Sequence, residues 1–136
     1  MRIMIDANIL LDVLQKRQPH YSCSSAIWKL CETGQVEGYF SALTFANLTY
    51  IMRKELSPEQ IRQVYSLLSL IFNVADLSEA DTAKAACLCW ADFEDAIQSV
   101  IAKRIHAEYI ITRNTKDFAD SDVPAISPEE FIRQFI

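Results

Sequence analysis

The sequence has little glycine or proline and no long apolar segment. Only two glycines and four prolines occur among its 136 residues, and no stretch has the composition of a linker or a low-complexity region. No run approaches the ~18 consecutive apolar residues that cross a bilayer, and the apolar opening ends at Asp6, too early for a signal peptide. We therefore expect a single domain over residues 1–136, in the cytoplasm and away from membranes.

Side chains of the kind that zinc prefers are also few. His20 and His106 stand alone, and Cys87 and Cys89 lie two apart in a helical pattern, where they do not share a face. No zinc-ligand spacing results, and only the even number of cysteines favours disulfides. We predict that the cysteines are buried, reduced thiols; they are Cys23, Cys31, Cys87 and Cys89.

The net charge of −5 argues against a protein that coats nucleic acid non-specifically. It leaves a nuclease open, because an acidic metal site itself contributes negative charge. Binding would then need a local basic rim, although each basic pair taken alone could be a solvated surface charge. The candidates are Lys16 with Arg17, Arg53 with Lys54, Lys103 with Arg104, and Arg113 with Lys116.

Short strands alternate with helices along the chain. Apolar runs rich in branched or aromatic residues predict strands at Arg2–Ile5, Gly38–Ser41, Phe72–Ala75, Tyr109–Thr112 and Val123–Ile126. Helical spacing covers Ile9–Leu14, Tyr21–Cys31 and about Asp95–Ile105, and three more helices begin at capping boxes headed by Ser57, Ser78 and Ser127. This order predicts an α/β fold with a short parallel sheet of four or five strands and helices on both faces.

Polar residues follow the strand ends, where open α/β sheets bind their ligands. Asp6 and Asn8 follow the first strand, and the helix that leads to the fourth strand begins near Asp92 and Asp95. The other residues at this edge are Ser41, Thr44 and Asn47 after the second strand, and Thr112, Arg113, Asn114 and Asp117 at and after the fourth. Carboxylates from three separate segments should therefore converge at one edge of the sheet.

Each of these carboxylates has an ordinary explanation when taken singly. Asp6 and Asp95 could cap helices, and Asp117 could lie in a solvated turn. A joint cluster is different, because carboxylates repel one another unless a cation or a proton intervenes. Oxygen ligands without His or Cys suit Mg²⁺ or Mn²⁺. Such an ion can activate water and neutralise a phosphodiester, so the pattern indicates phosphodiester hydrolysis.

Four segments in this order resemble the motifs of the PIN domain family. They are MIDANILLD at residues 4–12, SALT at 41–44, DFEDAI at 92–97 and TRNTKDF at 112–118. The likeness extends over nearly the whole chain and is closest to VapC-like toxins. It implies a three-layer sandwich and a metal-dependent endoribonuclease that is the toxin of a toxin–antitoxin pair. An RNA substrate, an antitoxin partner and a homodimer are part of the same implication.

The resemblance also implies roles for individual residues. Asp6, Asp95 and Asp117 would bind the Mg²⁺ or Mn²⁺ ion, with Asp92 as an accessory ligand. Thr112 and Asn114 would orient the carboxylates or a water molecule. The expected substrate contacts are Arg113, Asn8, Ser41 and Thr44, with Asn8 also supporting Asp6 and with a structural salt bridge as an equal alternative for Arg113.

One position departs from the family pattern. The helix after the second motif usually carries a glutamate, and here that position is Asn47, which offers a neutral carbonyl oxygen instead. Glu94 could compensate for it. Otherwise the chain either works with three aspartates, or is catalytically weak, or is an inactive PIN fold that binds RNA or protein. A phosphotransferase with an aspartate after the first strand is a further alternative, although the second aspartate or adjacent acidic pair that it needs is absent.

Overall fold

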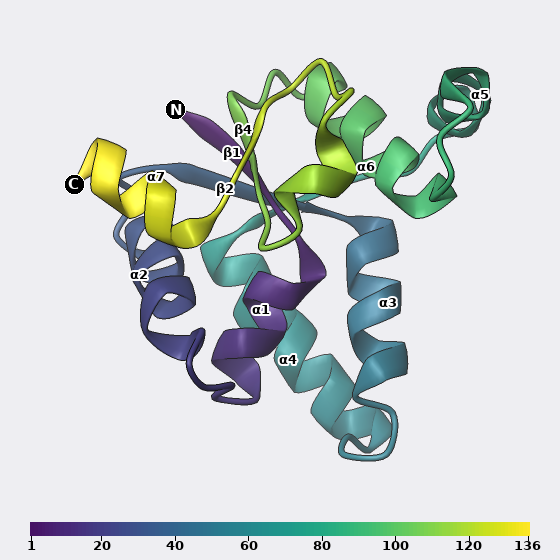
Figure 1. Cartoon of the computed structure of the whole chain (residues 1–136). Coiled ribbons are helices and arrows are strands. Elements are labelled where there is room, and N and C mark those ends of the chain that lie inside the picture. The colour runs from purple at the N-terminus through teal and green to yellow at the C-terminus, as the bar shows by residue number, and fades with distance from the viewer.

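The computed structural model describes residues 1–136 and contains a five-stranded sheet in which all strand pairs are parallel (Figure 1). The strand order is β3-β2-β1-β4-β5. The strands are β1 (Arg2–Ile5), β2 (Glu37–Ser41), β3 (Asn73–Ala75), β4 (Tyr109–Ile111) and β5 (Ala125–Ile126). All five predicted strands exist, and their predicted bounds differ by a residue or two. The chain adds β2 and β3 on one side of β1 and then adds β4 and β5 on the other side. The order of the strands therefore reverses between β1 and β4, although all strands stay parallel.

Seven α-helices and one 3₁₀ helix accompany the strands, and all but the last lie between two strands in the sequence. They are α1 (Ala7–Leu14), α2 (Tyr21–Glu32), α3 (Ala42–Ile51), α4 (Pro58–Ile71), α5 (Glu79–Leu88), α6 (Phe93–Arg104), η1 (Thr115–Phe118) and α7 (Pro128–Phe135). None of these helices is long and apolar enough to cross a membrane. The α/β class and the parallel sheet with helices on both faces are therefore confirmed.

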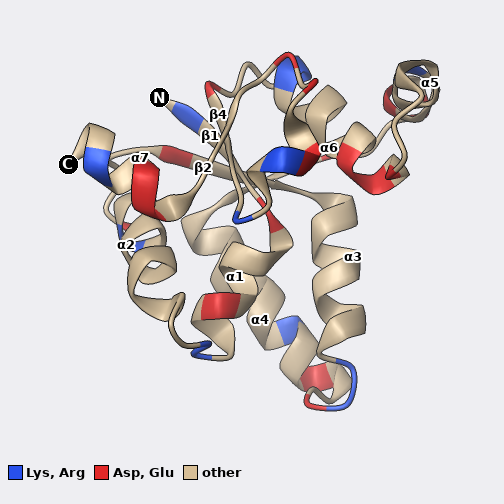
Figure 2. Ribbon diagram, in the orientation of Figure 1, with Lys and Arg blue, Asp and Glu red and all other residues tan.

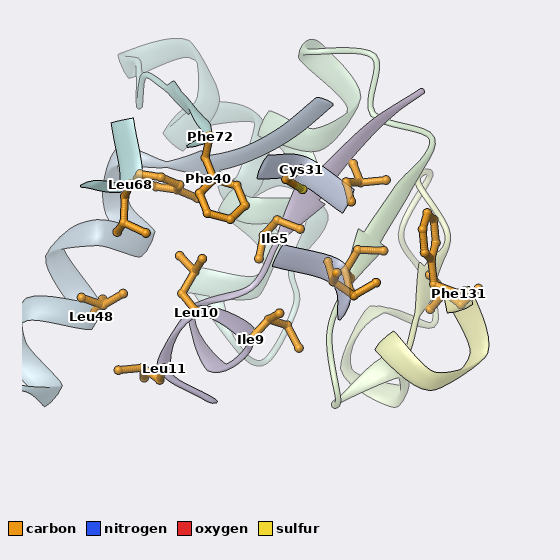
Figure 3. Close-up of a cluster of buried hydrophobic side chains, with 14 of the residues drawn as sticks. Ile5, Ile9, Leu10, Leu11, Cys31, Phe40, Leu48, Leu68, Phe72 and Phe131 are labelled. Atoms are coloured by element: carbon orange, nitrogen blue, oxygen red, sulfur yellow. The ribbon is translucent and has the colours of Figure 1, made fainter. Parts of the chain in front are cut away.

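Two hydrophobic cores lie on opposite faces of the sheet, because successive side chains of a strand point to opposite sides. Ile3 and Ile5 of β1 and Phe40 of β2 belong to one core, which also contains residues of α1, α2, α3, α4 and α7. Figure 3 shows Ile5 and Phe40 within this core. Met4, between the two isoleucines, packs with Ala75 and Ile110 against α5, α6 and η1. All residues of β1 after Arg2 are buried. This layering holds the end of β1 rigidly at the centre of the molecule.

Several helix starts follow from local sequence. Ser57 and Ser78 form complete capping boxes, in which the serine accepts from a backbone N–H and the side chain three residues on accepts in return. Ser127 accepts from the Glu130 N–H, but the predicted return bond is absent because the Glu130 carboxylate pairs with Arg133 instead. The helix α6 begins at Phe93, two residues before the approximate start that its spacing predicts, and Asp92 is its cap.

The two glycines and the cysteines have specific places. Gly34 has a φ of +77°, and a Cβ on Gly38 would lie 2.6 Å from the Cys31 sulfur, so both positions favour glycine. All four cysteines are free, as expected. The expectation that all are buried is wrong, since only Cys31 is buried and Cys87 and Cys89 are exposed on and after α5. The helical pattern there does not reveal that this part of α5 faces solvent.

Candidate functional site

An acidic cavity of about 370 Å³ opens at the carboxyl edge of the sheet. It lies where the strand order reverses, between β1 and β4, which is the position at which open α/β sheets bind ligands. Figure 2 shows acidic segments at the junction of β1 and α1 and at the N-terminal end of α6. The polar residues that line the cavity are Asp6, Asn8, Ser41, Thr44, Asn47, Tyr50, Asp92, Glu94, Asp95, Gln98, Asn114 and Asp117.

Asp6 lies at the centre of this edge. It occupies the cap position of α1, but its side chain makes no capping hydrogen bond. Thr112 Oγ1 donates to Asp6 Oδ2 at 2.7 Å, and the Asn114 N–H donates to Thr112 Oγ1 at 3.0 Å. Burial raises the pKa of Asp6, and the hydrogen bond from Thr112 only partly offsets this effect. The loop after β4 therefore positions the carboxylate that follows β1.

Asp95 projects into the cavity from the first turn of α6. Its pKa is raised to about 7, mainly by burial and also by repulsion from the nearby carboxylates of Asp92, Asp6, Asp117 and Glu94. Asp92 has a structural task as well, because its Oδ1 accepts from the Asp95 N–H at 3.0 Å and caps the helix. The carboxylates from three segments thus lie close enough to repel one another, which favours a proton or a cation between them.

These carboxylates surround the cavity rather than form a compact metal cage. No group of three or more His, Cys, Asp or Glu side chains lies close enough to hold an ion directly without rearrangement. The donor set still fits a hard cation, since it consists of carboxylate and amide oxygens. Mg²⁺ in particular keeps several water molecules and needs only one or two direct carboxylate ligands. The structure therefore agrees with an open, hydrated ion site.

Asn47 faces the cavity from α3, as its position after Thr44 predicts. Its Nδ2 donates to Glu94 Oε2 at 3.0 Å, and both residues line the cavity. Glu94 thus places a carboxylate next to the position where the family usually has a glutamate. An asparagine therefore occupies that position while Glu94 adds its carboxylate to those of Asp6, Asp92, Asp95 and Asp117 in the cavity lining.

Ser41 and Thr44 line the cavity but are already engaged. The Ser41 hydroxyl caps α3 by accepting from the Thr44 N–H at 3.0 Å, and it also lies 3.1 Å from the Thr44 hydroxyl. Asn8 also lines the cavity. Their expected contacts with a substrate stay predictions, and the local structure explains why Ser41 and Thr44 occur where they do.

Arg113 lies outside the acidic cavity and has a structural partner. Its guanidinium donates to both carboxylate oxygens of Asp12 on α1, each at 3.1 Å, and Asp12 also accepts from Ser24 at 2.8 Å. The Asp12 side chain is fully buried. Of the two expectations for Arg113, the structure thus contains the salt bridge, while a contact with phosphate stays untested.

The basic rim is sparse. Arg104 pairs with Asp76 and Asp81, and Lys103 pairs with Asp122. Two of the candidate pairs nevertheless supply a residue near the acidic cavity. Arg53 lies 4.0 Å from the ring centre of Tyr50, which lines the acidic cavity. Lys116 lines an adjoining cavity of about 680 Å³ that shares Asp92, Asp95 and Asp117.

Gln98 was missed by the sequence analysis, although a signal existed. It follows Asp95 by three residues on the same helix, so the two side chains share a face. Gln98 lines the acidic cavity and is buried. Once Asp95 is placed at the site, helical spacing alone indicates Gln98 as a neighbour.

Comparison with known proteins identifies the family and the fold. The sequence profile of the PIN domain matches residues 2–116. No curated protein gives a significant sequence match. Among solved structures, a toxin–antitoxin complex from Klebsiella pneumoniae matches with a TM-score of 0.71 and 24% identity, over 93% of this chain and 97% of the other.

Two further structures extend this comparison. The VapBC-1 structure from nontypeable Haemophilus influenzae has a TM-score of 0.71 and 20% identity, over 95% of this chain and 99% of the other. VapC20 of Mycobacterium tuberculosis, described as a sarcin–ricin loop cleaving toxin, has a TM-score of 0.65 and 10% identity over 79% and 86%. At these identities the likeness shows a shared fold.

Proposed function

The chain belongs to the PIN domain family, and we propose that it is a metal-dependent endoribonuclease that hydrolyses RNA phosphodiester bonds. We also propose that it is the toxin of a toxin–antitoxin pair. The observation that carries the nuclease proposal is the cavity at the carboxyl edge of the sheet, where Asp6, Asp95 and Asp117 lie together with raised pKa values for Asp6 and Asp95. Carboxylates held this close need positive charge to ionise together.

Asp6, Asp95 and Asp117 would hold Mg²⁺ or Mn²⁺, with Asp92 in support. When bound there, the ion neutralises charge on the phosphodiester and lowers the pKa of a water molecule. The chain's own part is positioning: Thr112 fixes the Asp6 carboxylate, and Asp92 fixes the first turn of α6 that carries Asp95. Without a cation, Asp95 shares its carboxylate with a proton near neutral pH, because its pKa is about 7.

Family membership and one structure of similar fold support a nuclease over a binding module. Family membership supports a nuclease, and the structure of similar fold from Mycobacterium tuberculosis is described as a cleaving toxin. The alternative of an inactive binding module depended mainly on Asn47. Glu94 weakens that alternative, because its carboxylate lies 3.0 Å from the Asn47 amide and inside the same cavity.

An antitoxin is the partner that fits this surface. Structures of the same fold come from toxin–antitoxin complexes, and a cavity lined by five carboxylates and no Lys or Arg would attract a basic side chain. We propose that the partner inserts an Arg or Lys into the cavity. Co-purification from the native host should recover a small basic partner, and recovery of the chain alone, harmless when overexpressed, would argue against a toxin. The homodimer stays a prediction that a mass measurement in solution tests.

Removal of the Asp6 charge tests the nuclease proposal. Asp6→Asn keeps an acceptor for Thr112 and removes a buried charge, so the variant should stay folded while Mn²⁺-dependent cleavage of single-stranded RNA is lost. Asp122→Asn is the matched control, because Asp122 is exposed and contacts Lys103 away from the cavity. It should cleave like the unmodified protein. Full cleavage by Asp6→Asn, or cleavage that persists in excess EDTA, would refute the metal-dependent mechanism.

A further inference from the structure

Gln98 is a buried polar side chain without a partner in the wall of the acidic cavity. It is 6% exposed, and its side-chain nitrogen is inaccessible to solvent and makes no hydrogen bond. It lies on α6, one turn after Asp95 and on the same face. Buried amide groups in native proteins almost always have a partner, so an unpaired one indicates a ligand or a water molecule.

The other buried polar groups of the cavity already have partners within the chain. They are Ser41 and Thr44, whose hydroxyls bond to each other. The half-buried Asn47 donates to Glu94. Gln98 thus differs from its neighbours, because its donor is buried in the cavity wall and no group of the protein uses it.

The charge of the cavity lining limits which groups could hydrogen-bond to a phosphate there. The lining has five carboxylates, at Asp6, Asp92, Glu94, Asp95 and Asp117, and no Lys or Arg. A phosphate that approached the cavity would therefore face like charges on most sides, and neutral donors must supply its hydrogen bonds. The Gln98 side-chain nitrogen is inaccessible to solvent in the free protein, so donation to a phosphate requires the side chain to rotate, for example by the half-turn about Cγ–Cδ that exchanges the amide nitrogen and oxygen.

We propose that Gln98 binds the substrate by donating from its side-chain amide to a non-bridging oxygen of the RNA phosphate in the acidic cavity. This inference rests on the proposed nuclease function. In the absence of RNA the donor is unpaired, which destabilises the free protein slightly. In the complex it contacts a charged acceptor, where hydrogen bonds are strongest.

Substitution by methionine separates binding from folding. Gln98→Met keeps the volume and removes the amide, so its melting temperature should be unchanged or higher, because an unpaired buried group is lost. The KM for a labelled single-stranded RNA of mixed sequence, measured with Mn²⁺, should rise about tenfold or more, with a smaller change in kcat. Gln63→Met is the control, because Gln63 is exposed on α4, away from the cavity, and it should leave both constants unchanged.

A direct readout comes from the ¹⁵N signal of the Gln98 side-chain amide, assigned by its absence in Gln98→Met. Addition of the same RNA with Ca²⁺ in place of Mn²⁺, to limit cleavage, should shift this signal. An unmoved signal with an unchanged KM would overturn the proposal, as would a lower melting temperature with unaltered kinetics, which indicates a structural role. Failure of the unmodified protein to cleave or bind RNA would instead contradict the proposed function itself.

Discussion

The ion pair between Arg113 and Asp12 connects the loop that carries the site to the first helix. Arg113 lies between Thr112 and Asn114, and its guanidinium contacts both oxygens of Asp12 at 3.1 Å. The Asp12 side chain is fully buried, whereas that of Arg113 is 27% exposed. Removal of the arginine would leave a buried carboxylate with Ser24 as its remaining donor.

The cost of that removal can be worked out from the burial. Breaking a buried ion pair by deleting one partner costs about 3–5 kcal/mol. The partial exposure of Arg113 admits water to Asp12, so we expect about 3 kcal/mol for Arg113→Met, near the lower end. For a chain of this length, this corresponds to a fall in melting temperature of roughly 10 °C. Asp12→Asn should cost less, because Arg113 can turn to solvent and Ser24 can still donate.

A double-mutant cycle decides what Arg113 does. If Arg113 acts through Asp12, the double variant should lose less stability than the sum of the single variants, with a coupling of about 2 kcal/mol. The effect of Arg113→Met on RNA cleavage should then largely disappear in the Asp12→Asn background, because the ion pair between Arg113 and Asp12 is already lost there. Additive stabilities, together with a rise in KM of the same factor in both backgrounds, would refute this reasoning and support a phosphate contact by Arg113.

Two further predictions concern the acidic cavity without and with metal. Since the pKa of Asp95 is about 7 instead of 3.8, the folded protein holds a proton that the unfolded chain releases, so stability in EDTA should fall as pH rises from about 4 to 7. Melting curves across this range should show the slope, Asp95→Asn should flatten it, and a flat curve for the unmodified protein would contradict the burial of Asp95. Asn47→Glu places a second carboxylate beside Glu94, so calorimetry should show Mn²⁺ binding tighter by roughly 1–3 kcal/mol, while the metal-free melting temperature falls or stays level. Unchanged Mn²⁺ affinity would mean that residue 47 does not face the metal.

The layout of the fold could be predicted because it depends on local and periodic signals. Apolar runs and serine caps identify the strands and most helix starts without knowledge of distant contacts. The rule that ligands bind at carboxyl strand ends then brought Asp6, Asp95 and Asp117 to one edge, and all three line one cavity. Their metal-binding role is a further step that this agreement does not test.

Other features depend on contacts that no local pattern contains. The partner of Arg113 is 101 residues away in the sequence, and nothing in TRNTKDF distinguishes a guanidinium that points at Asp12 from one that points at a phosphate. Asp92 and Asp95 are equally suitable residues for the cap of α6, and only the backbone geometry selects Asp92. Exposure of Cys87 and Cys89 likewise depends on which part of α5 the sheet leaves uncovered.

The contact between Asn47 and Glu94 changes how the departure from the family pattern should be weighed. Compared position by position, the chain loses a carboxylate on α3, and this loss favours an inactive protein. In space a carboxylate is present nearby, because Glu94 on α6 lines the same cavity. The Asn47 Nδ2 on α3 donates to its Oε2 at 3.0 Å. A glutamate at position 47 would repel Glu94, whereas an asparagine stabilises it, so the two residues are best understood as one unit. For the proposed metal site, we therefore expect the number of charges that face the cavity to matter more than the identity of residue 47.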